Sequence, residues 1–188
     1  MLNPKPYGLD TLVEDLRTIT VSAATEHEIL TRVRPLATRM AADPSWMHPH
    51  HYECDEAQGF GVHLLHEEPD HTLAVFAVAW LPGRGAPPHN HGTWAVVAGV
   101  DGAETNTMWK RLDDRSRPGH ADLRSSGSKK IRPRDVYTLP SDAIHSVTNE
   151  TQRVTLSLHI YGKHLNHTGR SQFDPAAQTE RPFILAVK

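Results

Sequence analysis

The sequence has very little cysteine, no long apolar run and no strong excess of either charge. Of its 188 residues only Cys54 is a cysteine, so no disulfide can form within the chain. No apolar run approaches the roughly 18 residues of a membrane-spanning helix. The 20 basic and 22 acidic side chains give a net charge of −2, which favours neither nucleic acid nor an anionic membrane as a partner.

Residues 1–16 also lack the basic start and the uninterrupted apolar stretch of a signal peptide. This absence and the single thiol fit a reducing compartment, and we expect a cytoplasmic protein. A length of 188 residues suits one domain with a sizeable core. We therefore expect one domain over residues 1–188, and the sequence carries no signal for its oligomeric state.

Two helices are expected in the first 45 residues. Apolar side chains recur at helical spacing in residues 8–19 and again in residues 22–42. Asp10 is a candidate N-cap for the first helix, and Pro35 should kink or divide the second.

Residues 43–59 are expected to form a loop. Its histidines could bind a metal ion, but histidines beside prolines in a loop more often face solvent; they are His48, His50 and His51. A surface or loop position is also expected for three scattered histidines, namely His27, His71 and His120.

From Gly59 onward the chain indicates β-structure. Apolar and β-branched residues gather in short runs separated by turn residues: 60–66, 72–80, 94–100, 103–109, 135–139, 146–148 and 154–161. The polar residues 113–130 predict an exposed hairpin or loop, and Phe183 to Val187 an edge strand that docks back on the rest. Many short strands favour a closed barrel or sandwich over a parallel sheet.

The 14 histidines include a pair that stands close together. His89 and His91 are two residues apart, so on an extended backbone both imidazoles point to the same side. His145, in the segment PSDAIHSVTN, is a third candidate ligand. Imidazole is a good ligand for divalent iron, zinc, copper or nickel, and these three side chains predict a metal site.

These segments resemble the two-part signature of the cupins, small β-barrels that hold a metal ion. The matching residues are Gly83, His89 and His91 in the first part and Pro140, His145 and Asn149 in the second. The sequence departs from the signature at Ala95, where the first part usually has a glutamate, and at Arg134 and Asp142, where the second part has glycines. The resemblance implies an all-β fold, a cupin barrel or double-stranded β-helix, with a helical N-terminal segment (residues 1–45) packed on it.

A row of polar residues alternates with apolar ones on the last strong strand, SLSLHIYG. Ser157, His159 and Tyr161 therefore face the same side. If that side is the barrel interior, the three groups form a hydrogen-bonded row beside the metal, because such groups are costly to bury without partners. The alternative is a face that is simply exposed to solvent.

Together, HNHGTW, PSDAIHSVTN and SLSLHIY resemble the thiol dioxygenases of the cysteine dioxygenase type, over about residues 60–170. Those cupins bind Fe(II) through three histidines and convert a small thiol and dioxygen into a sulfinic acid. The resemblance implies Fe(II) at His89, His91 and His145, and a relay of Ser157, His159 and Tyr161 in which the tyrosine donates a hydrogen bond toward substrate or oxygen. Because Ala95 supplies no acidic ligand, the ferrous ion would keep its full charge and free positions for thiol and dioxygen.

In mammalian-type members of this family, a cysteine near the position of Ala95 is covalently linked to the tyrosine. Cys54 is far from that position in the sequence. We therefore expect no cross-link here, as in many bacterial members, and an ordinary unpaired thiol at Cys54.

The resemblance leaves the substrate open. Members that act on cysteine bind its carboxylate with an arginine on an early strand, and relatives that prefer 3-mercaptopropionate have a glutamine there; this sequence has Val62, with His63 beside it. Arg170 matches an arginine of the 3-mercaptopropionate group and suits bidentate carboxylate binding, unless it is a surface residue of a polar loop. Arg84 and His63 are weaker candidates. We expect a small carboxylate-bearing thiol, either 3-mercaptopropionate, mercaptosuccinate or cysteine, with cysteine disfavoured because Val62 offers no partner for its amine.

Two other functions remain open from the sequence alone. A different metal-dependent cupin enzyme, such as an isomerase or an oxygenase of another substrate class, would use the same histidine spacing. A non-catalytic cupin that senses a small ligand would also keep the barrel. The row from Ser157 to Tyr161 and the missing glutamate favour the thiol dioxygenase over the first, and three intact candidate ligands favour chemistry over the second.

Overall fold

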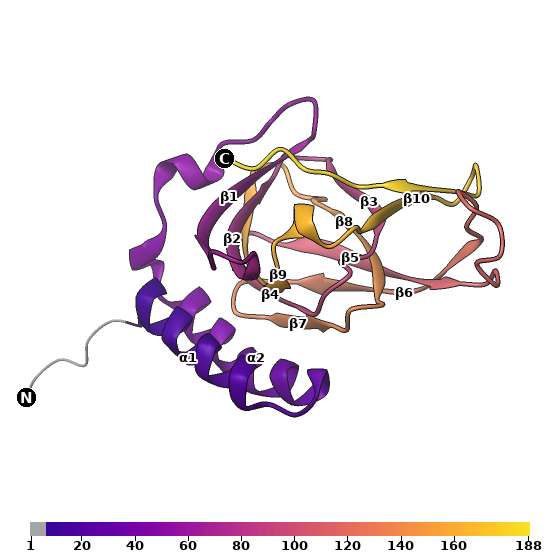
Figure 1. Cartoon of the computed structure of the whole chain (residues 1–188). Coiled ribbons are helices and arrows are strands. Elements are labelled where there is room, and N and C mark those ends of the chain that lie inside the picture. Colours follow the sequence, from indigo (N-terminus) through magenta and orange to yellow (C-terminus); the bar gives the residue numbers. More distant parts are fainter. Residues whose placement is uncertain (1–6) are drawn as a thin grey trace, which may run out of the picture.

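The computed structural model describes residues 7–188, in which two helices precede a β-barrel (Figure 1). The helices are α1 (Leu9–Ser22) and α2 (Glu26–Ala42), and short 3₁₀ turns follow at η1 (Pro44–Trp46), η2 (Pro49–Tyr52) and, after β9, η3 (Leu165–His167). The strands are β1 (Phe60–Glu67), β2 (Thr72–Trp80), β3 (Gly85–His89), β4 (Ala95–Asp101), β5 (Glu104–Arg111), β6 (Leu123–Ile131), β7 (Val136–Leu139), β8 (Ile144–Thr148), β9 (Thr155–Lys163), β10 (Ser171–Asp174) and β11 (Thr179–Pro182).

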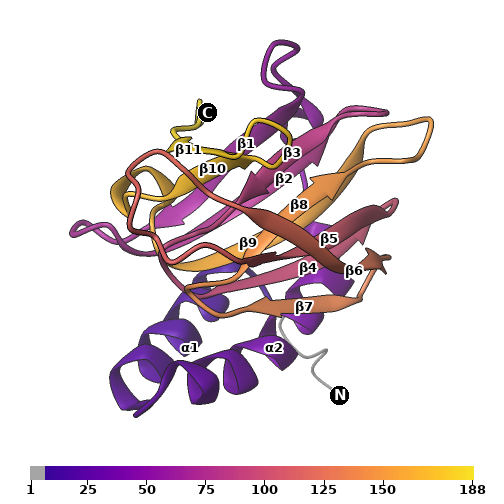
Figure 2. The same cartoon turned by 90° about the vertical axis from the view of Figure 1, so that its right-hand side faces the viewer.

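The strands form two antiparallel sheets that face each other (Figure 2). One sheet has the order β1-β2-β9-β4-β7 and the other the order β11-β10-β3-β8-β5-β6. Sequence neighbours such as β3 and β4 lie in different sheets, so the chain passes repeatedly from one sheet to the other. This confirms the predicted fold class, an all-β cupin barrel with a helical N-terminal segment.

Both helices cover the outer face of the five-stranded sheet (Figures 1 and 2). The sheet is therefore buried on two sides, which explains why β2 is apolar along its whole length. Alternate β2 residues such as Val75 and Ala77 pack with α1 and α2, whereas Phe76 and Val78 face the barrel interior. The same alternation on β9 sends Leu158 toward the helices and its two neighbours inward.

The helix boundaries differ from those predicted at both N-termini. Gly8, not Asp10, occupies the N-cap of α1, and Asp10 lies in the first turn, where a carboxylate interacts favourably with the helix dipole. The second helix begins at Glu26 and not at Ser22, because the Thr25 side chain accepts a hydrogen bond from the Glu28 N–H and caps it there. Pro35 does not divide α2, which continues to Ala42.

Of the two alternatives predicted over residues 113–130, an exposed hairpin or a loop, the structure has the hairpin, because the second half of this segment forms β6. Strand β6 pairs with β5 from Glu104 opposite Ile131 to Arg111 opposite Leu123. Only Leu123 and Ile131, at its two ends, are buried. An edge strand exposed along its middle needs no apolar alternation, so its sequence gives no strand signal.

The C-terminal segment docks on the barrel, but the regular edge strand predicted at Phe183 to Val187 does not form. The last strand is β11, and the backbone of Lys188 then pairs with Val62 and Leu64 of β1. The side chains of Phe183 and Leu185 are buried against the barrel interior.

The departure of Arg134 from the cupin signature is visible in the backbone. Arg134 has a φ of +72°, in the left-handed region that favours glycine. Its N–H donates to the carbonyl of Gly99, which fixes the turn that leads into β7. Within residues 7–188, no helix combines the length and apolar character needed to cross a membrane.

Candidate metal centre

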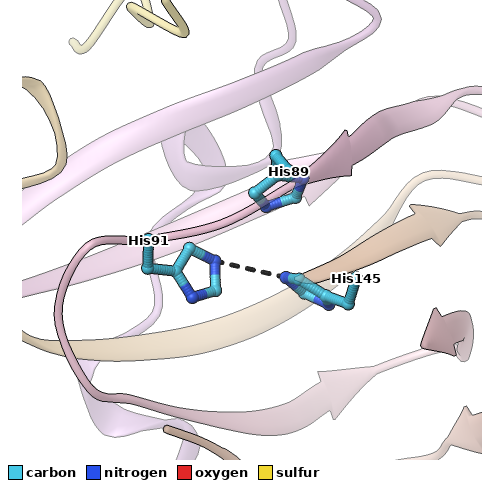
Figure 3. A group of neighbouring side chains, drawn as sticks. All are labelled: His89, His91 and His145. Carbon is cyan, nitrogen blue, oxygen red and sulfur yellow. Dashed lines mark hydrogen bonds between the residues drawn. The ribbon is translucent and has the colours of Figure 1, made fainter. Parts of the chain in front are cut away.

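Three buried histidines from the six-stranded sheet and the loop after β3 point toward one another (Figure 3). His89 ends β3 and lies directly opposite His145 of β8, while His91 follows two residues later. Their candidate ligand atoms all lie within 4.8 Å of one another. The structure thus brings together all three predicted ligands.

The spacing of two of these nitrogens fits a shared metal ion. Nε2 of His91 and Nε2 of His145 are 3.2 Å apart. Two nitrogens that each lie ~2.1 Å from one ion, with roughly 100° between the bonds, would be separated by about 3.2 Å. The donor set is three imidazole nitrogens without a carboxylate.

Hydrogen bonds fix the ring nitrogen that faces the centre. Nδ1 of His89 donates to the carbonyl of Pro87 at 2.7 Å, and Nδ1 of His145 donates to Oδ1 of Asn106 at 2.8 Å. Each ring therefore keeps the lone pair of Nε2 free for a metal, as orienting partners of metal-bound histidines usually do. Nδ1 of His91 has no such partner, and this ring is held by contacts with His145 and Tyr161.

The three rings are neutral near pH 7. Burial, with a smaller contribution from the Arg170 charge, lowers the pKa of His145 to about 3. Burial, followed by the charge of His145, lowers the pKa of His89 and His91 well below the ordinary value. Because only the neutral imidazole binds a metal, the barrel interior holds these side chains in the binding form.

The polar row on β9 lies inside the barrel and forms a hydrogen-bonded chain. Ser157, His159 and Tyr161 are each at most 3% exposed, which excludes the alternative of a solvent-facing row. The Oγ of Ser157 is 2.9 Å from Nε2 of His159, and Nδ1 of His159 is 2.8 Å from the Tyr161 hydroxyl. The Tyr161 ring contacts His91, with ring centres 5.1 Å apart, so the chain ends beside the three histidines.

Sequence reasoning missed two buried polar residues on β5 that extend this chain. Glu104 accepts hydrogen bonds from Ser157 at 2.9 Å and from the Asn106 amide at 3.1 Å. Asn106 in turn accepts from His145, as described above. The available signal was their spacing of two on a strand, but Thr105 and Thr107 are also polar, so the pattern did not show which face is inside.

A pocket opens beside the histidines and the tyrosine. It has about 340 Å³ of space, open solvent at its mouth included, and its lining includes His89, His145, Tyr161 and Arg170. Most of the remaining lining is apolar and includes Val62, Phe183 and Leu185. An apolar lining with a few polar groups is typical of a site for a small molecule.

Arg170 is a buried cation in this pocket rather than a surface residue. It is 3% exposed, its Nε donates to the carbonyl of Phe183 at 3.2 Å, and its Nη2 has no hydrogen-bond partner. Burial lowers the pKa of Arg170 to about 10, so the guanidinium stays charged near pH 7. An unpaired buried charge is costly, which favours an anionic ligand at this position.

The other predicted residues lie in different places. Val62 lines the pocket, but its neighbour His63 faces away, because adjacent residues on β1 point to opposite sides. Nε2 of His63 is 2.8 Å from the carbonyl of Glu53, and its ring lies beside His50 and His51. His63 and Arg84 therefore do not line the pocket.

The histidine loop does not form a metal group of the kind seen at His89. Nδ1 of His51 accepts from the backbone N–H of His48, and His51 is buried while His48 and His50 are not. Burial lowers the pKa of His51 to about 4. His27 is exposed, and the half-buried His71 and His120 lie in the loops after β1 and β5, as predicted for surface or loop histidines.

A second group of potential ligands, Glu67, His164 and His167, lies outside the pocket lining. Nδ1 of His164 accepts the backbone N–H of Asn166 at 3.2 Å, so the neutral ring carries its hydrogen on Nε2. Neither nitrogen of His164 then has a free lone pair, which makes this group a poor metal site.

Ala95 and Tyr161 lie opposite each other on β4 and β9. Ala95 is therefore the cross-strand neighbour of the tyrosine that ends the polar row. Cys54, by contrast, packs with the residues on the helix-covered face of the sheet, whereas Tyr161 belongs to the interior cluster.

Comparison with known proteins yields only distant structural similarities. No protein-family model matches the sequence. Among solved structures, the chain is similar to oxalate oxidase in complex with glycolate (19% identity, 56% of this chain and 52% of that chain, TM-score 0.45). It is also similar to the Schizosaccharomyces pombe Cnp3 cupin domain (11% identity, 64% of this chain and 69% of that chain, TM-score 0.47). A third similar structure is a Klebsiella pneumoniae protein with a double-stranded β-helix domain (9% identity, 70% of this chain and 99% of that chain, TM-score 0.48). The match spans about half of the oxalate oxidase chain, and none of the three informs the activity.

Proposed function

We propose that this protein is an Fe(II)-dependent thiol dioxygenase that converts a small carboxylate-bearing thiol into its sulfinic acid. The overall reaction is R–SH + O₂ → R–SO₂H, in which both oxygen atoms end on sulfur and the sulfur is oxidised. The observation that carries this proposal is the buried row Ser157, His159 and Tyr161, which ends at the pocket that His89, His145 and Arg170 also line.

The donor set supports a ferrous centre with room for reactants. His89, His91 and His145 are neutral, and the carboxylate of Glu104 is held by Asn106 and Ser157 rather than turned toward them. A ferrous ion held by these histidines would favour binding of the thiol as thiolate and activate dioxygen beside it.

Arg170 is the group best placed to bind the substrate carboxylate. Its Nη2 is buried and unpaired, and its stack on Phe183 holds the plane of the guanidinium. A carboxylate at Nη2 would satisfy both the donor and the charge, and it would leave the thiol end of a short substrate directed at the histidines.

The lining of the pocket favours one carboxylate and no amine. Among its described lining residues, Arg170 is the only lysine or arginine, and no carboxylate is present to receive an ammonium group. Val62 adds only apolar surface at the position expected for a polar substrate contact. Of the three candidate thiols, 3-mercaptopropionate fits this lining better than cysteine, whose amine has no partner, or mercaptosuccinate, whose second carboxylate has none.

The test is thiol-dependent oxygen consumption by anaerobically iron-loaded protein. The panel contains 3-mercaptopropionate, mercaptosuccinate, cysteine, cysteamine and a thiol-free control, and mass spectrometry identifies the product. We expect uptake with 3-mercaptopropionate and a product heavier by two oxygen atoms. Bound iron without uptake for any thiol would contradict the proposal and favour a cupin enzyme of another substrate class.

A further inference from the structure

The polar chain does not end at Ser157, and its far end is an ionisable group, Glu104, that does not itself line the pocket. Glu104 is 3% exposed, and its carboxylate meets three neutral neighbours: Asn106 on its own strand, Ser157 on β9 and, through Ser157, Trp80 on β2. No charged side chain of the described residues pairs with it. A buried carboxylate without a cation is costly, so its presence calls for a role.

The donors along the chain can point in only one direction while Glu104 is ionised. A carboxylate only accepts, so Ser157 must donate its hydroxyl hydrogen to Glu104. The Ser157 oxygen then accepts from the Trp80 indole N–H at 3.1 Å and from Nε2–H of His159. Nδ1 of His159 is left as an acceptor and takes the hydrogen of the Tyr161 hydroxyl. The pocket therefore meets the lone pair of the Tyr161 oxygen.

Protonation of Glu104 reverses the three hydrogen bonds that link Glu104, Ser157, His159 and Tyr161, while the Trp80 indole N–H, which can only donate, keeps its bond to Ser157. The carboxylic acid donates to Ser157, Ser157 donates to Nε2 of His159, and Nδ1–H of His159 donates to the tyrosine oxygen. The Tyr161 hydroxyl hydrogen is then free to point into the pocket. Asn106 donates to the other carboxyl oxygen in both states, so its hydrogen bond to His145 is not disturbed.

We propose that Glu104 receives the proton of the substrate thiol through Tyr161, His159 and Ser157, and that this transfer turns the Tyr161 hydroxyl from an acceptor into a donor toward the pocket. This inference rests on the proposed thiol dioxygenase function. It makes Glu104 a positioning residue that acts through Tyr161, since it touches neither the substrate nor the metal ligands.

The transfer conserves atoms and charge. The S–H bond breaks and its proton goes to the Tyr161 oxygen, the tyrosine hydrogen goes to Nδ1 of His159, Nε2–H goes to Ser157, and the serine hydrogen goes to Glu104. One S–H bond is lost and one O–H bond is formed on the carboxyl group. Each of the three middle residues gives up one hydrogen as it takes another, so only Glu104 and the sulfur change charge. No electron moves in this step.

The pocket gives this route an advantage over proton release to solvent. A thiol that binds as thiolate adds a negative charge to a buried site. Protonation of the Glu104 carboxylate removes a negative charge from the same interior. Burial raises the pKa of Glu104 above its ordinary value, and its hydrogen bonds to Asn106, Ser157 and Trp80 offset this only in part. The carboxylate is thus a better base than an exposed one.

The direct test counts protons released when 3-mercaptopropionate binds to anaerobic, iron-loaded protein at neutral pH. Calorimetry in buffers of different ionisation enthalpy gives this number. For the wild-type protein we expect almost no proton release, because Glu104 absorbs the proton. For Glu104→Gln, whose amide can accept from Asn106 and donate to Ser157 as the protonated carboxyl group does but cannot take up a proton, we expect about one proton released per thiol bound. The control Glu14→Gln, which removes an exposed carboxylate of α1, should match the wild type.

A second readout and a second variant keep the test decisive. Infrared difference spectra of the wild type should show a new protonated-carboxyl band on thiol binding, and Glu104→Gln should lack it. If Glu104→Gln does not fold, Ser157→Ala breaks the same route with the carboxylate in place and should also release about one proton. Equal proton release by the wild type and these variants, or one proton released by the wild type, would overturn the role of Glu104 even if thiol-dependent oxygen uptake persists. A wild-type protein that binds no thiol would overturn the proposed function itself.

Discussion

Arg170 lies over the ring of Phe183, with its guanidinium carbon 4.3 Å from the ring centre. The Phe183 carbonyl accepts the Arg170 Nε–H, and the Phe183 ring also contacts His89, with ring centres 5.3 Å apart. One residue of the C-terminal segment therefore holds both the buried cation and a candidate metal ligand. The docked C-terminal segment is thus part of the site.

Replacing Arg170 by lysine should weaken substrate binding much more than turnover. Lysine keeps the charge but loses the planar fork and the stack on Phe183. We expect KM for 3-mercaptopropionate to rise by about 10- to 100-fold, as for loss of one charged hydrogen bond, with iron content unchanged. Steady-state oxygen uptake measures this, and Arg124→Lys on the exposed face of β6 is the control. An unchanged KM would remove Arg170 from substrate binding.

Replacing Asn106 by alanine should weaken metal binding although the residue is not a ligand. It removes the acceptor for Nδ1–H of His145 and leaves that ring free to turn. Loss of such an orienting partner typically costs about 10- to 100-fold in metal affinity. Chelator competition measures the affinity, with His145→Ala as the fuller loss and Thr107→Ala on the same strand as the control. Wild-type affinity in Asn106→Ala would show that packing alone orients His145.

Replacing Tyr161 by phenylalanine should leave iron in place and slow the reaction. The ring and its contact with His91 remain, and only the hydroxyl next to His159 is lost. We expect turnover to fall by about 10²-fold or more, the usual contribution of a positioned proton donor or acceptor. Tyr137→Phe on β7 serves as the matched control. A wild-type rate in Tyr161→Phe would exclude the hydroxyl from the mechanism.

Strand periodicity accounts for what the sequence could predict at this site. A spacing of two predicted that His89 and His91 point to the same side, and the structure brings these two side chains together. The same spacing predicted a common face for Ser157, His159 and Tyr161, which are hydrogen-bonded to one another in the structure. The same rule admits only one of Val62 and His63 to the pocket, and in the structure it is Val62, the residue that the resemblance placed at the substrate position. The turn at Arg134 depends on a left-handed backbone conformation that its residue type does not favour.

The rest of the site depends on contacts between distant parts of the chain. Glu104 and Asn106 lie on a strand with polar residues on both faces, so only the packing of β5 against β8 and β6 shows which pair is buried. Arg170 lies between η3 and β10, where no periodicity operates. Its burial follows from the return of Phe183, whose side chain packs in the barrel interior.

The metal-free protein should lose stability in mild acid. Its buried histidines stay neutral in the folded chain but take up protons when the chain unfolds, so acid favours the unfolded state. Burial, with smaller effects of the His145 and Arg170 charges, lowers the pKa of His159 from 6.5 to about 3. Between these values the unfolded chain binds a proton that the folded chain does not. The contribution of His159 to the free energy of unfolding is therefore fully present above pH 6.5 and is lost as the pH drops toward 3. Each such histidine contributes a slope of about 1.4 kcal/mol per pH unit. Urea unfolding across this interval should therefore be less steep in pH for His159→Gln than for the wild type, while the exposed His27→Gln keeps the wild-type slope. If the dependence of the unfolding free energy on pH were identical in all three proteins, His159 would have the same pKa in the folded and the unfolded chain. Burial of His159, which is 3% exposed, would then have no effect on its pKa.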